Sequence, residues 1–163
     1  MRNGLLAIMA LVALLCGGCG LILGPKVAPA TPTTQPRTLY DRLGGKKAIT
    51  DVVDDFVSRA AADPKVNFTR KGIPNAEFDP TPQNVIHLKS QLVDFISQAT
   101  GGPKEYKGQN MKDSHRHMQI TSAEFDAMAT DLKATLDKFH VPSKEQAELM
   151  TIVGSTKKDI VTK

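Results

Sequence analysis

Two histidines that lie two residues apart are the clearest candidates for metal chemistry in this chain. His115 and His117 occur in the stretch GQNMKDSHRHMQI, residues 108–120, and the whole chain has only four histidines. On a strand, both side chains would point to the same side and could share one metal ion. On a helix they would point about 200° apart, so only one could face a given pocket. The local structure of this stretch therefore decides its chemistry.

The neighbouring residues favour a helical turn over a strand. The stretch lies between a glycine-containing turn and the sequence TSAE, which begins at Thr121 and has the pattern of a helix start. In a short helix Met111 and His115 are four residues apart and share a face, while His117 points elsewhere. A metal ion shared by both histidines is therefore disfavoured. From spacing alone, two ordinary solvent-facing histidines are the simpler interpretation.

Apolar residues recur at helical spacing over most of the chain beyond residue 47. These stripes cover residues 48–60, 85–99, 125–139 and 147–153. Thr121 and Glu124 can cap the third helix reciprocally, and Ser143 is the expected cap of the fourth. No stretch alternates convincingly as a strand, so the predicted fold class is all-α. Residues 63–84 carry prolines and a glycine but no stripe, which predicts a long loop of the kind that often borders a site.

The N-terminal residues are typical of a processing signal. They contain a basic residue, Arg2, then an apolar run over residues 5–15 that is too short for an ordinary membrane-spanning helix. The segment resembles a bacterial lipoprotein signal in which Cys19 is lipidated, although Cys16 stands where such signals usually carry leucine; plain secretion is the alternative. The expected organisation is a signal peptide over 1–19, a proline-rich tether over 20–37 and a folded domain over 38–163.

The expected location and partners follow from the same features. The mature chain should face an extracytoplasmic compartment, as a membrane-anchored lipoprotein on the periplasmic side or as a secreted protein. The net charge is +4 and the lysines are scattered, so no nucleic-acid partner is expected. A chain of 163 residues has the length of one domain and can bury a real core.

The order of several short motifs resembles one known family. They are LYDRLGGKKAI, DFV followed by AADPKV, ATGGPKEYKGQNMKDSH, EFDAMATDLKATLDKFHVP and IVGS. Each is weak alone, but in this order and at these spacings the chain, over residues 39–160, resembles the group I truncated haemoglobins. The resemblance implies a shortened globin, a two-over-two helical sandwich around one haem b. It also implies that His115 is the proximal iron ligand, four residues after Met111.

The resemblance places further residues around the haem. An imidazole that binds haem iron should donate its second ring N–H to a backbone carbonyl. Phe68 corresponds to a phenylalanine that packs on the haem face, and Lys112 and Tyr106 are candidates to bind the propionates. The expected haem contacts, taken together, are Phe56, Val57, Phe68, Leu88, Gln91, Leu92, Phe95, Met111, Lys112 and Tyr106.

This sequence departs from the family on the distal side. Val57 stands where the family usually has tyrosine, and Leu88 and Leu92 stand where it often has glutamine. Gln91 aligns with a position where some relatives carry an iron-binding histidine, and His87 lies one turn earlier. Because bound O₂ is polar, the loss of a hydrogen bond should speed its release about tenfold.

Two functional classes stay open at this point. The first is a globin that reversibly binds O₂, NO or CO at the cell envelope. The second is a haem enzyme, such as a nitric oxide dioxygenase or a peroxidase, which would depend on a separate reductase to return electrons to iron. A tethered helical module without haem is a third, plainer interpretation. Gas binding without enzymatic turnover is the favoured prediction.

Overall fold

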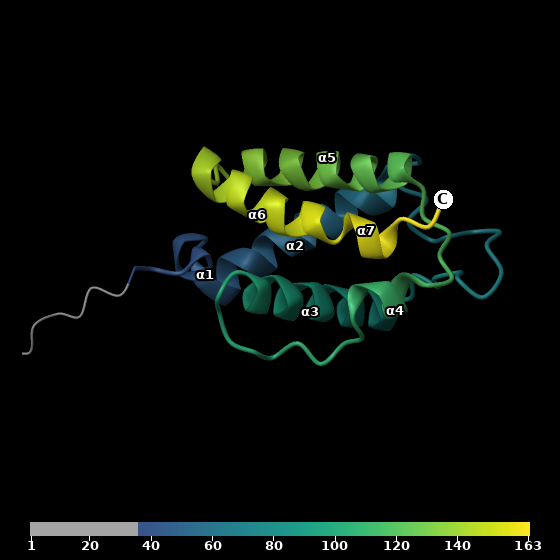
Figure 1. Cartoon of the computed structure of the whole chain (residues 1–163), viewed down its shortest axis with the longest axis horizontal. Coiled ribbons are helices and arrows are strands. Elements are labelled where there is room, and N and C mark those ends of the chain that lie inside the picture. The colour runs from purple at the N-terminus through teal and green to yellow at the C-terminus, as the bar shows by residue number, and fades with distance from the viewer. Residues whose placement is uncertain (1–35) are drawn as a thin grey trace, which may run out of the picture. The chain divides into compact units, whose positions relative to one another are not determined.

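The computed structural model describes residues 36–163, so the predicted signal peptide, with Cys19, and nearly all of the predicted tether lie outside the described residues. The described chain is helical (Figure 1). Its only β-type pairing is an isolated bridge between Ile120 and Val161. The prediction of an all-α fold is confirmed. The helices are α1 (Leu39–Arg42), α2 (Gly45–Ala62), α3 (Pro82–Ala99), α4 (Met111–His115), α5 (Ser122–Lys138), α6 (Ser143–Ser155) and α7 (Lys157–Ile160).

Helix α2 lies at the centre of the domain. It packs on α3 on one side and on α5 on the other, and α6 lies against α5, which gives two helices over two (Figure 1). Val53 on α2 and Leu136 on α5 are almost completely buried where these layers meet. Helix α4 packs on α7 instead of on α3. The short helix that carries His115 is therefore held in place by the last helix of the chain.

The helix starts test the sequence predictions one by one. Thr121 and Glu124 form the reciprocal cap that was expected: each backbone N–H is bonded by the other residue's side chain. The prediction that Ser143 caps α6 is wrong, because Pro142 is the N-cap and Ser143 is already helical. The carbonyl of Pro142 accepts the first helical bond from Gln146, and no side chain caps this end.

The segment between α2 and α3 is a loop, as predicted, but it is a compact one. The amide of Phe78 donates to the carbonyl of Thr69 at 2.9 Å, and the rings of Phe68 and Phe78 meet edge to face at 5.6 Å. Helix α3 begins at Pro82, three residues before its apolar stripe, because Thr81 accepts from the Asn84 amide and caps it. The loop is therefore shorter than the 63–84 span expected from the sequence.

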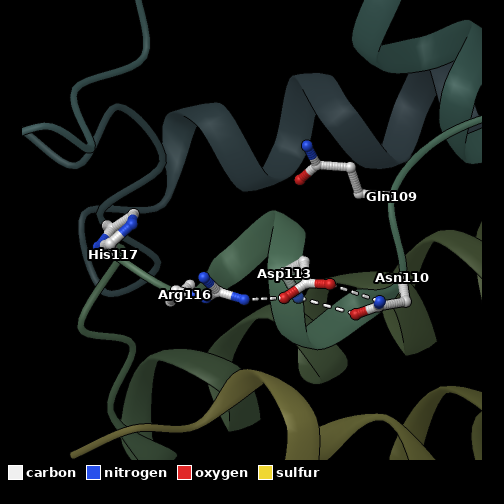
Figure 2. Close-up of a pocket in the computed structure, with 5 residues that line it drawn as sticks. All are labelled: Gln109, Asn110, Asp113, Arg116 and His117. Atoms are coloured by element: carbon white, nitrogen blue, oxygen red, sulfur yellow. Dashed lines mark hydrogen bonds and ion pairs between the residues drawn. The ribbon is translucent and has the colours of Figure 1, made fainter.

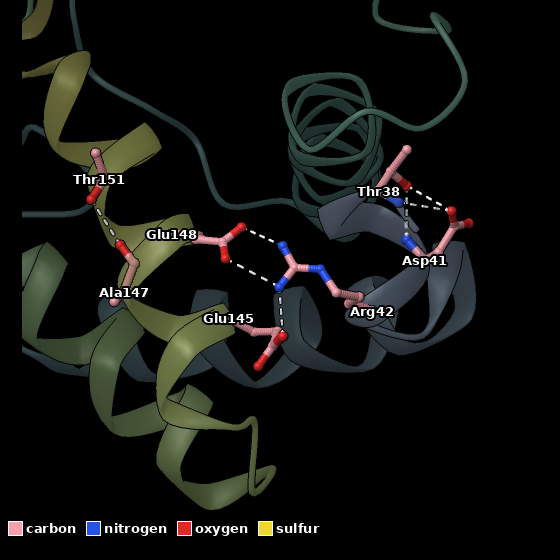
Figure 3. A network of polar contacts seen from close by, with 7 residues as sticks. All are labelled: Thr38, Asp41, Arg42, Glu145, Ala147, Glu148 and Thr151. Atoms are coloured by element: carbon pink, nitrogen blue, oxygen red, sulfur yellow. Dashed lines mark hydrogen bonds and ion pairs between the residues drawn. The ribbon is translucent and has the colours of Figure 1, made fainter. Parts of the chain in front are cut away.

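Helix α1 is fixed to α6 by a network of charged groups (Figure 3). Arg42 Nη1 lies 2.6 Å from Glu145 Oε1 and 3.1 Å from Glu148 Oε1, and Nη2 is also bonded to Glu148. Glu145 is buried, so this network is partly shielded from water. It lies at the opposite end of the domain from α4 (Figure 1).

Among the described residues, no helix combines the length and the apolar character needed to cross a membrane.

Candidate functional site

A specific cap explains why the stretch around His115 folds as a helical turn. The side chain of Asn110 accepts from the Asp113 amide at 2.9 Å, and the Asn110 amide group donates to the Asp113 carboxylate at 2.6 Å. Hydrogen bonds from Asn110, together with the nearby Arg116, hold the pKa of Asp113 below its usual value. Asn110 was missed by sequence reasoning, although its N-x-x-D spacing was a readable capping signal.

The geometry of His115 defines its chemistry. Its Nδ1 lies 2.7 Å from the Met111 carbonyl oxygen and 3.0 Å from Ser114 Oγ. A carbonyl oxygen can only accept, so in the neutral ring Nδ1 must carry the proton and Nε2 keeps its lone pair. Burial lowers the pKa of His115 below its ordinary value, against a smaller opposing effect of the Met111 hydrogen bond. The ring is therefore a neutral, oriented imidazole with Nε2 available to a metal, and the expected N–H···carbonyl bond is confirmed.

His117 is not part of this arrangement. It is exposed and lines a polar surface pocket with Gln109, Asn110, Asp113 and Arg116 (Figure 2). In Figure 2 Asp113 is bonded to Asn110 and Arg116, whereas His117 stands apart. No group of three His, Cys, Asp or Glu residues within 36–163 could hold a metal ion. A metal at His115 would therefore need its other ligands from a cofactor such as a porphyrin.

The predicted haem contacts fall into two classes by burial. Phe56 and Val57 on α2 are buried in the core. Large apolar side chains on α3 and in the neighbouring segments are only half-buried: Phe68, Leu88, Leu92, Phe95 and Met111. Helix α3 has no extensive packing against α4, α5, α6 or α7 in the described domain. Part of its apolar face is thus available to a flat, apolar cofactor such as haem.

Gln91 and Tyr106 lie together at the loop that follows α3. A Cβ atom placed on Gly108 would lie 2.7 Å from Gln91 Oε1 and would also clash with the Tyr106 hydroxyl. Gln91 Oε1 is buried without a hydrogen-bond partner among the described residues. An unpaired buried acceptor costs about 1–3 kcal/mol. A bound cofactor or ligand could supply the hydrogen-bond donor that Gln91 Oε1 lacks.

The two candidates for propionate binding differ in what they can offer. The Tyr106 hydroxyl donates to the Gln109 carbonyl at 2.6 Å, and its ring meets Phe95 edge to face at 5.6 Å. Burial raises the pKa of Tyr106, so the hydroxyl keeps its proton, and that proton is already engaged. Lys112 is exposed on α4 and its ammonium group can move to an anionic edge. His87 and His140 are both exposed.

Comparison with known proteins identifies the family. A family model described as bacterial-like globin matches residues 38–162. A group 1 truncated haemoglobin of Tetrahymena pyriformis is 33% identical over 129 residues, which cover 79% of this chain and 98% of that protein. The chain belongs to the group I truncated haemoglobins. A relative from Mycolicibacterium paratuberculosis is 31% identical over 128 residues, covering 78% of this chain and 87% of its own length.

Solved structures of truncated haemoglobins share this fold. The ferric form from Tetrahymena pyriformis superposes with a TM-score of 0.66 at 31% identity and covers 78% of this chain and 100% of its own. A 2/2 haemoglobin from Synechococcus with covalently attached haem gives 0.65 at 28% identity, again over 78% and 100%. As a truncated haemoglobin, the chain binds haem and diatomic gases. The neutral imidazole, the half-buried apolar face of α3 and the orphaned Gln91 oxygen fit that cofactor.

Proposed function

We propose that this truncated haemoglobin holds one haem b through Nε2 of His115 and reversibly binds O₂, NO and CO at the cell envelope. The observation that carries the proposal is the hydrogen bond from His115 Nδ1 to the Met111 carbonyl. It fixes the tautomer and the ring orientation, and burial keeps the ring neutral. Haem held by one imidazole supplies an open iron face to which a diatomic gas can bind.

The chain's own residues shape the pocket in which the gas is held. Leu88 and Leu92 come from the half-buried face of α3 and Val57 from the buried face of α2. These side chains exclude water but offer no hydrogen-bond donor. Gln91 is a polar side chain on the same helix as Leu88 and Leu92, and its oxygen lies against Gly108, beside Tyr106. We infer that the pocket admits O₂, CO and NO alike and stabilises polar O₂ only weakly.

Reversible binding is tested by repeated addition and removal of O₂. The ferrous, haem-loaded protein should return to its starting absorption spectrum after each cycle under argon. Rapid conversion to the ferric form in each cycle would argue against a reversible carrier. If oxidation were then driven by NO and reversed by an added flavin reductase, the enzymatic alternative, a nitric oxide dioxygenase served by a separate reductase, would replace it.

The location at the envelope is proposed from the sequence of the N-terminal segment. Small residues precede Cys19, and the tether over 20–37 contains four prolines. A proline-rich chain of this length spans roughly 55 Å when extended, at about 3.1 Å per residue. Such a tether would let the globin domain stand clear of a membrane while the lipid holds it there.

Lipid modification of Cys19 is expected in the bacterial host. Mass spectrometry of the native N-terminus should find Cys19 as the first residue with acyl groups attached. The Cys19→Ala variant should move from the membrane fraction to the soluble extracytoplasmic fraction, because a protein that lacks the acyl chains loses its anchor. An unmodified N-terminus beyond residue 19 would show ordinary secretion instead.

A further inference from the structure

Arg70 is a buried charge in the loop between α2 and α3. Only 5% of its surface is accessible, whereas Lys71 and Gly72 beside it are exposed. Its backbone has φ of +52°, in the left-handed region that favours glycine. This conformation costs about 1–2 kcal/mol for an ordinary L-residue. The contacts of the guanidinium must therefore hold Arg70 in place.

Those contacts go to the segment that connects α4 with α5 and to the first turn of α5. Nη2 of Arg70 donates to the Met118 carbonyl at 2.5 Å and to the Gln119 carbonyl at 3.3 Å, and Nη1 pairs with Glu124 Oε1 at 2.9 Å. Glu124 is at the same time the capping partner of Thr121 at the start of α5. Two nitrogens of one rigid, planar group thus join a helix cap to two backbone carbonyls, whereas an ammonium would have to do so from a single nitrogen.

The same segment is bonded directly to the proposed iron ligand. The amide of Met118 donates to the carbonyl of His115 at 3.0 Å. The Met118 carbonyl therefore accepts a hydrogen bond from Arg70, while the Met118 amide donates one to His115. On the other side, Phe68, the predicted haem-face phenylalanine, lies two residues before Arg70 in the same loop. Arg70 connects the loop that carries Phe68 with the turn that carries His115.

The carboxylate of Glu124 carries the charge that Arg70 pairs with. Burial alone would raise the pKa of Glu124, but the backbone N–H of Thr121 and the Arg70 guanidinium outweigh it, and the pKa is lowered. Glu124 is therefore ionised at neutral pH and remains a partner for Arg70.

We propose that Arg70 is a positioning residue for His115. Through Met118, Arg70 fixes the depth and tilt of the His115 imidazole relative to the haem. This inference rests on the proposed role of His115 as the iron ligand. Without the guanidinium, the 116–121 segment can shift, and the imidazole that it follows is no longer held at one distance from the iron. Both the strength of the iron–histidine bond and haem retention then depend on a residue that touches neither group.

The test compares Arg70→Met with Arg42→Met. Arg42 forms another partly buried arginine–glutamate network, at the far end of the domain, so its loss should destabilise the fold without reaching His115. Two properties are measured on haem-loaded protein: the iron–histidine stretching band of the ferrous, gas-free form by resonance Raman, and the rate of haem transfer to apomyoglobin. Arg70→Met should shift or broaden the band and speed haem loss about tenfold, the lower end of the effect of groups that orient a metal ligand. Arg42→Met should do neither.

Arg70→Lys provides a second variant in case Arg70→Met does not fold. Lysine keeps a charge for Glu124 but lacks the two separate nitrogens with which Arg70 bonds Glu124 and the carbonyls, so the band should still shift. An unchanged band in the Arg70 variants, or equal haem loss in Arg70→Met and Arg42→Met, would overturn the inference and leave His115 as the ligand. If the wild-type protein shows no iron–histidine band at all, the proposed ligand itself is wrong and the inference falls with it.

Discussion

Replacement of His115 with alanine should abolish stoichiometric haem binding. His115 presents the half-buried, neutral imidazole of the site, and its Nε2 is left free by the bond from Nδ1 to Met111. Removal of an axial ligand should weaken haem affinity by more than about 100-fold, the upper end of the effect seen when only an orienting group is lost. Titration of haem into the purified variant, followed by its Soret absorption, measures the loss.

His117→Ala is the matched control for this change. It removes an imidazole of the same chemistry two residues away, from an exposed position on the polar pocket of Figure 2. Haem affinity should stay within a factor of about two, as expected for a surface substitution. Imidazole added to His115→Gly should restore part of the Soret band, because the small molecule can occupy the place of the lost ring. Loss of haem from His117→Ala with retention by His115→Ala would show that the ligand was assigned to the wrong histidine.

Introduction of a hydroxyl on the distal side should slow the release of O₂. In Val57→Tyr, the phenol replaces a buried valine on α2, at the position where the family usually has tyrosine. One hydrogen bond worth about 1.4 kcal/mol lowers the dissociation rate about tenfold. CO is much less polar than O₂, so its release should change little. Stopped-flow dissociation of both gases measures the two effects.

Two further variants separate the effect of the hydroxyl on O₂ release from other causes of a slower rate. Val57→Phe adds the same ring without the hydroxyl, so any slowing that it shares with Val57→Tyr reflects bulk in a buried site. Gln91→Leu asks whether the nearby amide already acts as a donor. Its oxygen lies against Gly108, and we expect the O₂ rate of Gln91→Leu to match the wild type. A slow wild-type rate that rises sharply in Gln91→Leu would make Gln91 the distal residue and contradict an apolar pocket.

The elements around the site could be predicted from local sequence because local patterns determine them. Apolar stripes located α2, α3 and α5, and the capping pair Thr121 and Glu124 fixed where α5 begins. The helical turn at Met111–His115 followed from the same kind of evidence, and it separated His115 from His117. The prediction of Ser143 as a cap failed because Pro142 takes that position. A serine before a helical stripe does not show whether the serine itself or the residue before it is the last non-helical one.

Other features depend on contacts that no local pattern contains. The partners of Arg70 lie 48 to 54 residues further along the chain, so nothing in the loop sequence marks it as buried. The side-chain direction of Gln91 is set by the loop at Gly108, which lies beyond the end of α3. The path of the proline- and glycine-containing loop could not be predicted, because only one of its left-handed residues, Gly72, is a glycine, whereas Asn67, Arg70 and Asn75 are not.

Titration of haem into the purified wild-type chain tests the central claim most directly. The Soret band of free haem should shift and sharpen, and the change should saturate at one haem per chain. After reduction without gas, the spectrum should be that of a five-coordinate iron with one histidine ligand, and CO should convert it at once to a six-coordinate form. A chain that leaves the spectrum of free haem unchanged, or that never saturates, would contradict the assignment of His115 as the ligand of a single haem.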